Sequence, residues 1–257
     1  MSAPRRSRAG AIAVAVLAIT AMVVIVGVSI VTALDDRDDR SNRPQRGDGL
    51  TAADVAPDTP VPQPAPLAED TDLAAWAGTA ARRSGVPARA LRAYAAAEIA
   101  QRSDTPGCRL SWSTLAGIGR VESDHGRFGG ADVDADGVAR PRIIGVPLDG
   151  TAGVREIRDT DGGRLDGDTT FDRAVGPMQF LPTTWADFGA DGNGDGVRDP
   201  HQLDDAALAA AHYLCAGGRN TASGEGWWAG VLTYNASLDY ARLVWAAVDR
   251  YAEATAA

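Results

Sequence analysis

The chain has 257 residues and a formal net charge of −9, from 34 acidic and 25 basic side chains. Proteins that bind nucleic acid carry basic surfaces, so this balance argues against nucleic acid as a partner. An acidic polymer would have to be recognised by local groups rather than by the overall charge.

The N-terminal segment begins with a basic stretch, residues 1–10, which we expect in the cytoplasm. Residues 11–34 then form an apolar run without a charge, and an acidic stretch follows. A bilayer is crossed by about 20 apolar residues, and basic residues before such a run predict a cytoplasmic N-terminus. We expect a transmembrane signal anchor that holds an extracytoplasmic domain at the cell membrane. The alternative is a signal peptide cleaved near Ala33, which would release a secreted protein.

Residues 35–70 are rich in Pro, Asp and Arg and contain few large apolar side chains. Repeated prolines favour an extended, semi-rigid chain. Such a segment buries too little surface to offset its ordering entropy. We predict a disordered linker between the anchor and a domain at residues 71–257, which is long enough for one core.

The domain shows the periodicity of helices rather than of strands. A cap at Asp70 or Thr71 begins the first helix, and Ser237 caps the last. Helices are predicted at residues 71–83, 87–101, 112–124, 182–188, 204–216, 227–235 and 237–253. Residues 129–170 are rich in Gly and Asp, and residues 142–147 are their one strand-like piece. The pattern indicates a mainly α domain with a small irregular or β insertion.

The predicted helix at residues 112–124 carries Glu122 near its end, on the face that also bears Leu115 and Ile118. Burial and the negative end of the helix dipole both disfavour a charged carboxyl there, so both raise its pKa. A carboxyl that stays protonated near neutral pH can act as a general acid. Taken alone, a solvated glutamate or one paired with Arg120 is the simpler interpretation.

Three short motifs occur in order along the chain: Glu122-Ser123, Gly176-Pro-Met-Gln-Phe180 and Tyr234-Asn235. With these motifs, residues 72–252 resemble the lytic murein transglycosylases, most closely the membrane-bound B type in its actinobacterial form. The resemblance implies a lysozyme-like fold of the goose-type and soluble lytic transglycosylase kind. It also implies a substrate, the glycan strands of peptidoglycan.

By this resemblance Glu122 acts alone as acid and base. It would protonate the glycosidic oxygen of the β-1,4 bond from MurNAc to GlcNAc and then accept the C6 hydroxyl proton of the same sugar, with assistance from the N-acetyl group. The reaction consumes no water, leaves a 1,6-anhydroMurNAc end and is formally that of a lyase. Glycosidases usually need a second carboxylate. No motif supplies a suitable second carboxylate. Asp124 is a poor candidate, because it lies on a different helix face from Glu122.

The resemblance assigns supporting roles to four polar side chains. Gln179 would hydrogen-bond the substrate or orient the glutamate, and Tyr234 would hold or polarise the glutamate through its hydroxyl. Asn235 would support the loop or the sugar, and Ser123 would make a local hydrogen bond. Sugars also stack on aromatic rings, for which the candidates are Trp185, Trp227, Trp228 and Tyr213.

The stretch Asp191-Gly-Asn-Gly-Asp-Gly-Val197 matches the start of an EF-hand calcium loop. Gln202 stands where the usual closing glutamate would be, but the B-type family has a longer loop whose closing carboxylate corresponds to Asp205. We predict a structural Ca²⁺ held by Asp191, Asn193, Asp195, the Val197 carbonyl and Asp205. The alternative is a turn without metal. Three similar stretches are interpreted as turns, at residues 132–137, 159–163 and 166–168.

The two cysteines, Cys108 and Cys215, form an even pair in a domain expected outside the cytoplasm, which favours a disulfide. Closing so long a loop would stabilise the fold by about 4–5 kcal/mol. Two buried free thiols are the alternative. Zinc is not expected, because the chain has three histidines and no second ligand pair beside His212 and Cys215.

Two other functions stay open. A hydrolytic muramidase on the same fold would use water where the C6 hydroxyl attacks, and the absence of a second carboxylate argues against it. A non-catalytic cell-wall-binding or division protein would use the fold only for binding, and the intact set of Glu122, Gln179 and Tyr234 argues against that. No separate peptidoglycan-binding module is visible, and the sequence identifies no division or wall-synthesis partner.

Overall fold

The computed structural model describes residues 49–151 and 154–256. The predicted cytoplasmic stretch, the predicted anchor and the first part of the predicted linker, residues 1–48, lie outside the described residues. Among the helices that are described, none combines the length and apolarity needed to cross a membrane.

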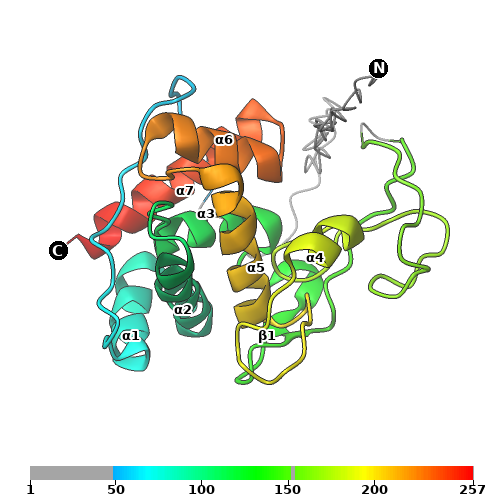
Figure 1. The fold of residues 1–257 in the computed structure, drawn as a ribbon, viewed down its shortest axis with the longest axis horizontal. Coiled ribbons are helices and arrows are strands. Elements are labelled where there is room, and N and C mark those ends of the chain that lie inside the picture. The colour runs from blue at the N-terminus through cyan, green and yellow to red at the C-terminus, as the bar shows by residue number, and fades with distance from the viewer. Residues whose placement is uncertain (1–48, 152–153, 257) are drawn as a thin grey trace, which may run out of the picture.

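The mainly α prediction is confirmed, because α-helices are the main regular secondary structure of the described residues, beside one short hairpin (Figure 1). The helices are α1 (Leu73–Ser84), α2 (Ala88–Asp104), α3 (Trp112–Ser123), α4 (Pro182–Phe188), α5 (Leu203–Cys215), α6 (Gly224–Tyr234) and α7 (Leu238–Thr255). Two 3-10 helices, Phe128–Gly130 and Ala216–Gly218, and one hairpin of β1 (Asp132–Val133) and β2 (Ala139–Arg140) complete the described elements.

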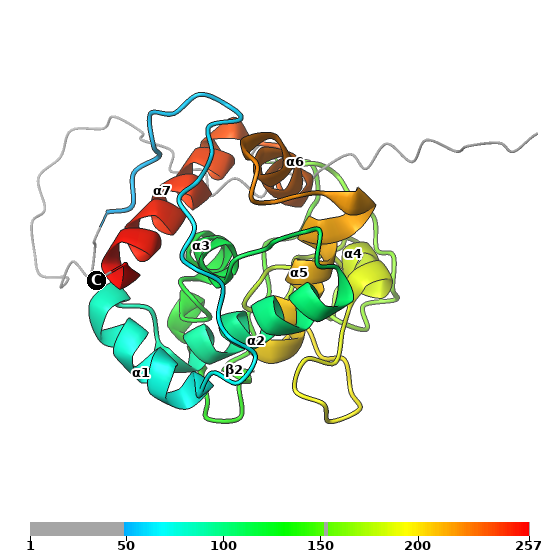
Figure 2. The same cartoon turned by 60° about the vertical axis from the view of Figure 1, so that its left-hand side comes forward.

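The core is built around α3, which packs against α2 and α7 and also contacts α5. Figure 2 shows α3 near the centre, with the other helices around it. Leu115 and Ile118 are fully buried, and a Cβ added at Gly117 would lie 2.7 Å from Val248 Cγ2. Glycine therefore allows α3 and α7 to approach closely, and α3 is fixed by apolar contacts on most sides. The same packing therefore fixes the position of the C-terminal end of α3, which bears Glu122.

Most helix boundaries follow the predicted pattern, with differences at the ends. Ser237 caps α7 as predicted, because its side chain accepts the N–H of Tyr240. The cap of α1 is Asp72 rather than Asp70 or Thr71. The N-cap of α6 is Ser223, so this helix begins three residues earlier than predicted. The two misplaced starts are both set by side-chain acceptors that satisfy free N–H groups of the first turn.

The predicted strand at residues 142–147 is wrong, because Ile144 makes only an isolated bridge with Val175. The hairpin lies earlier, where Asp132 pairs with Arg140 across an antiparallel β1–β2 ladder. The turn predicted at residues 132–137 lies within this hairpin, and the Asp134 carboxylate accepts the Val138 N–H there. The insertion is therefore mostly irregular.

The linker prediction is wrong for residues 49–70, which we call the strap. The strap runs along the outside of the helical domain from α7 to α2 (Figure 2). Val61 is buried, with 8% of the residue exposed, and Arg242 of α7 donates to the Val55 carbonyl. The N–H of Ala53 donates in turn to the Arg242 carbonyl. Although the strap lacks secondary structure, it is part of the domain.

A buried carboxylate holds the other end of the strap. Glu98 of α2 is 2% exposed, and it accepts the N–H of Leu67 at 2.9 Å and the N–H of Trp112 at 2.8 Å. Burial raises the pKa of this carboxyl, while the two backbone hydrogen bonds and Arg102 lower it. One side chain therefore connects the strap, α2 and the first residue of α3.

The predicted disulfide is confirmed, since Cys108 is bonded to Cys215 across a separation of 107 residues. It ties the segment between α2 and α3 to the end of α5.

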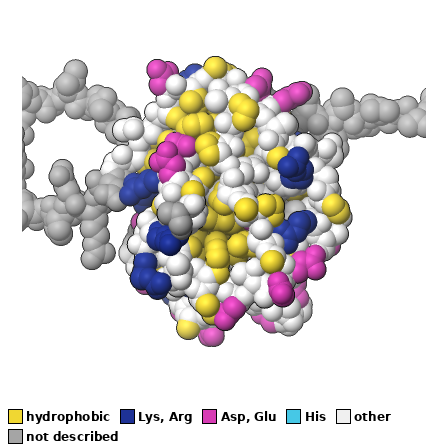
Figure 3. Space-filling model, turned by 90° about the vertical axis from the view of Figure 1, so that its left-hand side faces the viewer, with side chains coloured by type: hydrophobic (Ala, Val, Ile, Leu, Met, Phe, Trp, Pro, Cys, Tyr) yellow, Lys and Arg dark blue, Asp and Glu magenta, His cyan; other side chains and the backbone are white. Residues whose placement is uncertain are grey.

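Figure 3, a view of the left-hand side of Figure 1, shows apolar side chains beside arginines, with acidic groups towards the edges. On this face the charged side chains are therefore not spread evenly.

The role of the strap predicts the effect of two truncations. A chain that begins at Asp72 should unfold at a lower temperature than one that begins at Gly49. The loss should be about 2–4 kcal/mol, because Val61 no longer covers apolar surface and buried hydrogen bonds are broken. Thermal unfolding followed by circular dichroism measures the difference. Equal midpoints for the two chains would contradict an integral strap.

Candidate active site

Glu122 lies in the last turn of α3, and its surroundings perturb its pKa. The helix ends directly after it, because Asp124 and His125 adopt left-handed φ angles of 52° and 61°. Burial raises the pKa of the Glu122 carboxyl from 4.5 to about 8, and a hydrogen bond from Tyr240 opposes this rise. The side chain is nevertheless partly exposed. At neutral pH this carboxyl therefore holds a proton that a ligand can reach.

The hydrogen-bond partner of the glutamate is Tyr240, in the first turn of α7. Its hydroxyl donates to Glu122 Oε1 at 2.6 Å. The sequence had assigned this contact to Tyr234, and that assignment is wrong, because the Tyr234 hydroxyl donates to the Met178 carbonyl at 2.6 Å. Tyr234 still lies near the glutamate, since burial first and the Glu122 charge second raise its pKa well above 10.

The Gly176–Phe180 motif forms a tight turn. Val175 and Phe180 exchange two backbone hydrogen bonds of 2.9 Å across it. Gly176 has a φ of 78°, and a Cβ there would lie 1.8 Å from the Pro200 carbonyl oxygen, so only glycine fits. Gln179 has a φ of 50°, and its side-chain amide donates to the Gly176 carbonyl at 2.9 Å. The turn therefore presents Gln179 in a fixed, half-buried position.

Two side chains connect this turn to its neighbours. Ser123 is 2% exposed; its hydroxyl donates to the Pro177 carbonyl at 2.5 Å and accepts the Gly126 N–H at 2.8 Å. The second connection is the Tyr234 bond to Met178. Because Ser123 directly follows Glu122, the turn lies beside the end of α3. Ser123 thus holds the site together through local hydrogen bonds, the role that the resemblance implies for it.

Asn235 and Trp185 also have structural contacts. Asn235 is 3% exposed, and its side chain accepts the N–H of Ser237, so it shapes the link between α6 and α7. Trp185 is 6% exposed, and its ring meets Phe180 edge-on at a centroid distance of 5.4 Å. Phe180 meets Tyr234 in the same way at 5.8 Å. Of the other stacking candidates, Trp227 and Trp228 are buried in the core, whereas Tyr213 is half-buried and donates its hydroxyl to the Thr233 carbonyl.

The sequence missed two residues close to the site, Tyr240 and His125. Tyr240 lies six residues after Tyr234, on the buried face of a predicted helix. Its place on that face is the one sequence signal that could have identified it. The His125 ring lies between the hydroxyls of Tyr94 and Tyr251, at 3.2 and 3.0 Å. Burial lowers the pKa of His125 to about 3, so the ring is neutral. It fixes the chain directly after Glu122.

The predicted calcium loop is ordered by its own carboxylates. Asp191 accepts the N–H groups of Gly194, Asp195 and Gly196. Asp205, which is 1% exposed, accepts those of Gly192, Asn193 and Asp199. Burial raises the pKa of Asp205, and the charge of Asp191 adds to this effect. The two ends of the loop therefore place like charges close together.

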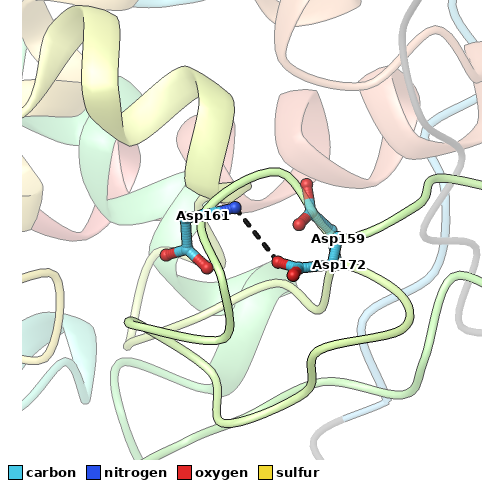
Figure 4. Close-up of side chains that lie close together, drawn as sticks. All are labelled: Asp159, Asp161 and Asp172. Atoms are coloured by element: carbon cyan, nitrogen blue, oxygen red, sulfur yellow. Dashed lines mark hydrogen bonds between the residues drawn. The ribbon is translucent and has the colours of Figure 1, made fainter.

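Within the described part of the chain, the carboxylates that lie closest together belong to a second acidic group, in the insertion. Oxygens of Asp159, Asp161 and Asp172 lie within 4.8 Å of one another (Figure 4). Asp159 accepts the N–H groups of the two residues after Asp161, and Asp172 accepts from Thr160. Hydrogen bonds within the insertion therefore account for the group, in line with the turn predicted at residues 159–163.

The comparisons with known proteins agree with part of this site. Residues 165–241 match the family model described as "Transglycosylase SLT domain". The match includes the Gly176–Phe180 turn, Asp191–Asp205, Tyr234 and Tyr240, and it begins after Glu122. A comparison with curated proteins finds no match.

Among solved structures, the chain is similar to the Escherichia coli lytic transglycosylase SLT35 in complex with bulgecin A. The identity is 14% over 74% of this chain and 82% of that chain, with a TM-score of 0.39. So distant a likeness carries no argument about this chain. The family match and the geometry of the site therefore stand as the basis for assigning a function.

The hydrogen bond between Tyr240 and Glu122 predicts a pKa change. Tyr240→Phe removes a donor that favours the charged carboxylate, so the pKa of Glu122 should rise above about 8. Carboxyl NMR chemical shifts followed against pH measure it. Tyr234→Phe is the matched control and should leave the titration nearly unchanged, because that hydroxyl bonds Met178. An unchanged or lower pKa in Tyr240→Phe would show that the bond does not act as described.

Proposed function

We propose that this chain is a peptidoglycan lytic transglycosylase. It cleaves the β-1,4 bond from MurNAc to GlcNAc and leaves 1,6-anhydroMurNAc ends. The observation that carries the proposal is the reachable Glu122 carboxyl, protonated near neutral pH and held by Tyr240 beside the Gly176–Phe180 turn. The transglycosylase SLT match over residues 165–241 supports the same class of enzyme.

Glu122 serves first as the acid. Its proton passes to the glycosidic oxygen as the bond to the anomeric carbon breaks, while the substrate's N-acetyl oxygen supports the developing positive charge. The resulting carboxylate then accepts the C6 hydroxyl proton as that oxygen bonds to the anomeric carbon. The proton is regained and no water is consumed. A pKa near 8 suits both steps, and Tyr240 stabilises the carboxylate between them.

A single carboxylate fits this route better than hydrolysis. The groups that shift the pKa of Glu122 in the described structure are its buried surroundings and Tyr240, with no acid among them. A muramidase that activates water ordinarily has a second carboxylate across the bond. Gln179 binds the substrate from the turn, and Tyr234, Asn235 and Ser123 maintain the shape of the site around it.

The proposal extends to the type of enzyme and its location. The order of the motifs and the long acidic loop closed by Asp205 support the B type in its actinobacterial form, with a lysozyme-like fold. The apolar run at residues 11–34 supports a single-pass anchor with the catalytic domain outside the cytoplasm. Cleavage near Ala33 and secretion is the alternative.

We also infer that the loop from Asp191 to Asp205 takes Ca²⁺. The donors present are carboxylate, amide and carbonyl oxygens, which are the ligands that Ca²⁺ prefers. A divalent cation would also relieve the repulsion between Asp191 and the buried Asp205. Asn193, Asp195 and the Val197 carbonyl would complete the site. The ion would stabilise the loop and takes no part in the bond cleavage.

The activity is tested with peptidoglycan sacculi and the full-length chain. Wild-type protein should release muropeptides one water lighter than the reducing form, detected by mass spectrometry. Glu122→Gln should lower the rate by at least about 10²–10⁴-fold, because general acid–base catalysis is lost. Glu253→Gln, on the exposed end of α7, is the matched control and should keep the wild-type rate. Reducing-end products would point to a muramidase, and no products from any form would point to a binding protein.

The metal is tested by thermal unfolding with and without 10 mM Ca²⁺. With an affinity of about 10⁻⁴–10⁻³ M, the ion should add about 1.5–3 kcal/mol of stability. Asp205→Asn should abolish this increment whatever its own basal stability, whereas Asp187→Asn, at an exposed residue of α4, should retain it. The proposal fails if chelator-treated and calcium-loaded wild type unfold alike.

A further inference from the structure

A cavity of about 310 Å³ lies on the insertion side of the candidate site. Arg164 and Leu165 of the insertion line it, together with Trp185 and Ala186 of α4. Arg198, within the Asp191–Asp205 loop, also lines the cavity. Its volume lies at the lower end of the range of about 300–1,000 Å³ for small-ligand pockets. Two of the five lining residues are arginines.

Neither arginine has a carboxylate partner among the described residues. Other arginines of the chain do, such as Arg89 with Asp204 and Arg173 with Asp168. Arg198 donates one hydrogen bond, to the Gly189 carbonyl at 3.2 Å, which fixes its guanidinium at the wall. Both side chains are exposed. Their remaining donors are arranged as planar forks, a geometry that fits a carboxylate.

The rest of the lining is apolar, and it connects the cavity to the candidate active site. Trp185, Leu165 and Ala186 offer a wall on which an aliphatic group can pack. The Trp185 ring contacts Phe180, and Phe180 contacts Tyr234, which lies beside Glu122. The cavity and Glu122 therefore border the same aromatic cluster.

We propose that this cavity is a subsite for the acidic peptide stem of the glycan strand. A stem carboxylate bonds Arg164 and Arg198, and the aliphatic part of the stem packs on Trp185 and Leu165. The inference rests on the proposed transglycosylase function and specifies which part of the substrate is recognised. A neutral sugar would leave two guanidinium groups without their natural partner. The lactyl carboxylate of MurNAc carries the same chemistry, so the test separates the two sources.

Binding is measured with the full-length Glu122→Gln variant, which does not consume the ligand. Three probes are compared: glycan strands with stems, strands stripped of stems that keep the lactyl carboxylate, and neutral chitooligosaccharides. Adding Arg164→Gln and Arg198→Gln should weaken binding of stem-bearing strands about tenfold and leave the other two probes unchanged. Arg92→Gln, an exposed residue of α2, removes the same charge elsewhere and should have no effect. Thermal unfolding confirms that each variant is folded.

Three outcomes of the binding experiment would overturn the proposal. An equal loss for stripped strands would assign the arginines to the lactyl group, and no loss, or no binding of stem-bearing strands at all, would exclude a stem subsite. Failure of the proposed function is seen separately, in the sacculus assay with wild-type protein. Stem-dependent binding without anhydro products would keep the subsite and remove the activity. Anhydro products without any effect of the arginines would do the reverse.

Discussion

The structure depends on the burial of one end of α3. Apolar contacts with α2 and α7 fix that helix, and the same contacts remove water from the Glu122 carboxyl and raise its pKa to about 8. Tyr240 limits the rise, because its hydrogen bond favours the charged form. For an acid whose pKa is raised by folding, the stabilising effect is full below about 4.5 and is lost as the pH rises through about 8. The site is therefore maintained against a stability cost that grows between about pH 4.5 and about pH 8.

The other end of α3 is held by a second buried carboxylate, with a different task. Glu98 has both oxygens occupied by backbone N–H groups, one from the strap and one from Trp112. It is 2% exposed, whereas Glu122 is reachable. Two acids with raised pKa values thus lie on neighbouring helices. Their hydrogen-bond partners distinguish a structural carboxyl from a chemical one, because a group whose acceptors are already filled has little to offer a ligand.

Features that depend on local sequence pattern could be predicted, whereas features that depend on contacts between distant parts of the chain could not. Helical periodicity gave the helix order, and it placed Glu122 near the end of α3. The strap was misread as disordered because its composition is that of a linker, while its partners, such as Glu98 and Arg242, lie far along the chain. The Tyr234 assignment failed for a similar reason: which tyrosine reaches Glu122 depends on how α6 and α7 meet. The insertion lacked any periodicity from which a register could be read.

The acidic loop and the Gly176–Phe180 turn cannot be positioned independently. A Cβ at Gly176 would clash with the Pro200 carbonyl oxygen. Pro200 directly follows Asp199, whose N–H donates to the Asp205 carboxylate. The arrangement of the acidic loop thus sets the wall against which the turn rests. The Gly176–Phe180 turn also carries Gln179, and its carbonyl groups accept hydrogen bonds from the hydroxyls of Ser123 and Tyr234. An ion bound in the loop would therefore act on Glu122 through packing, from outside the reacting groups, and would stiffen the site without entering the chemistry.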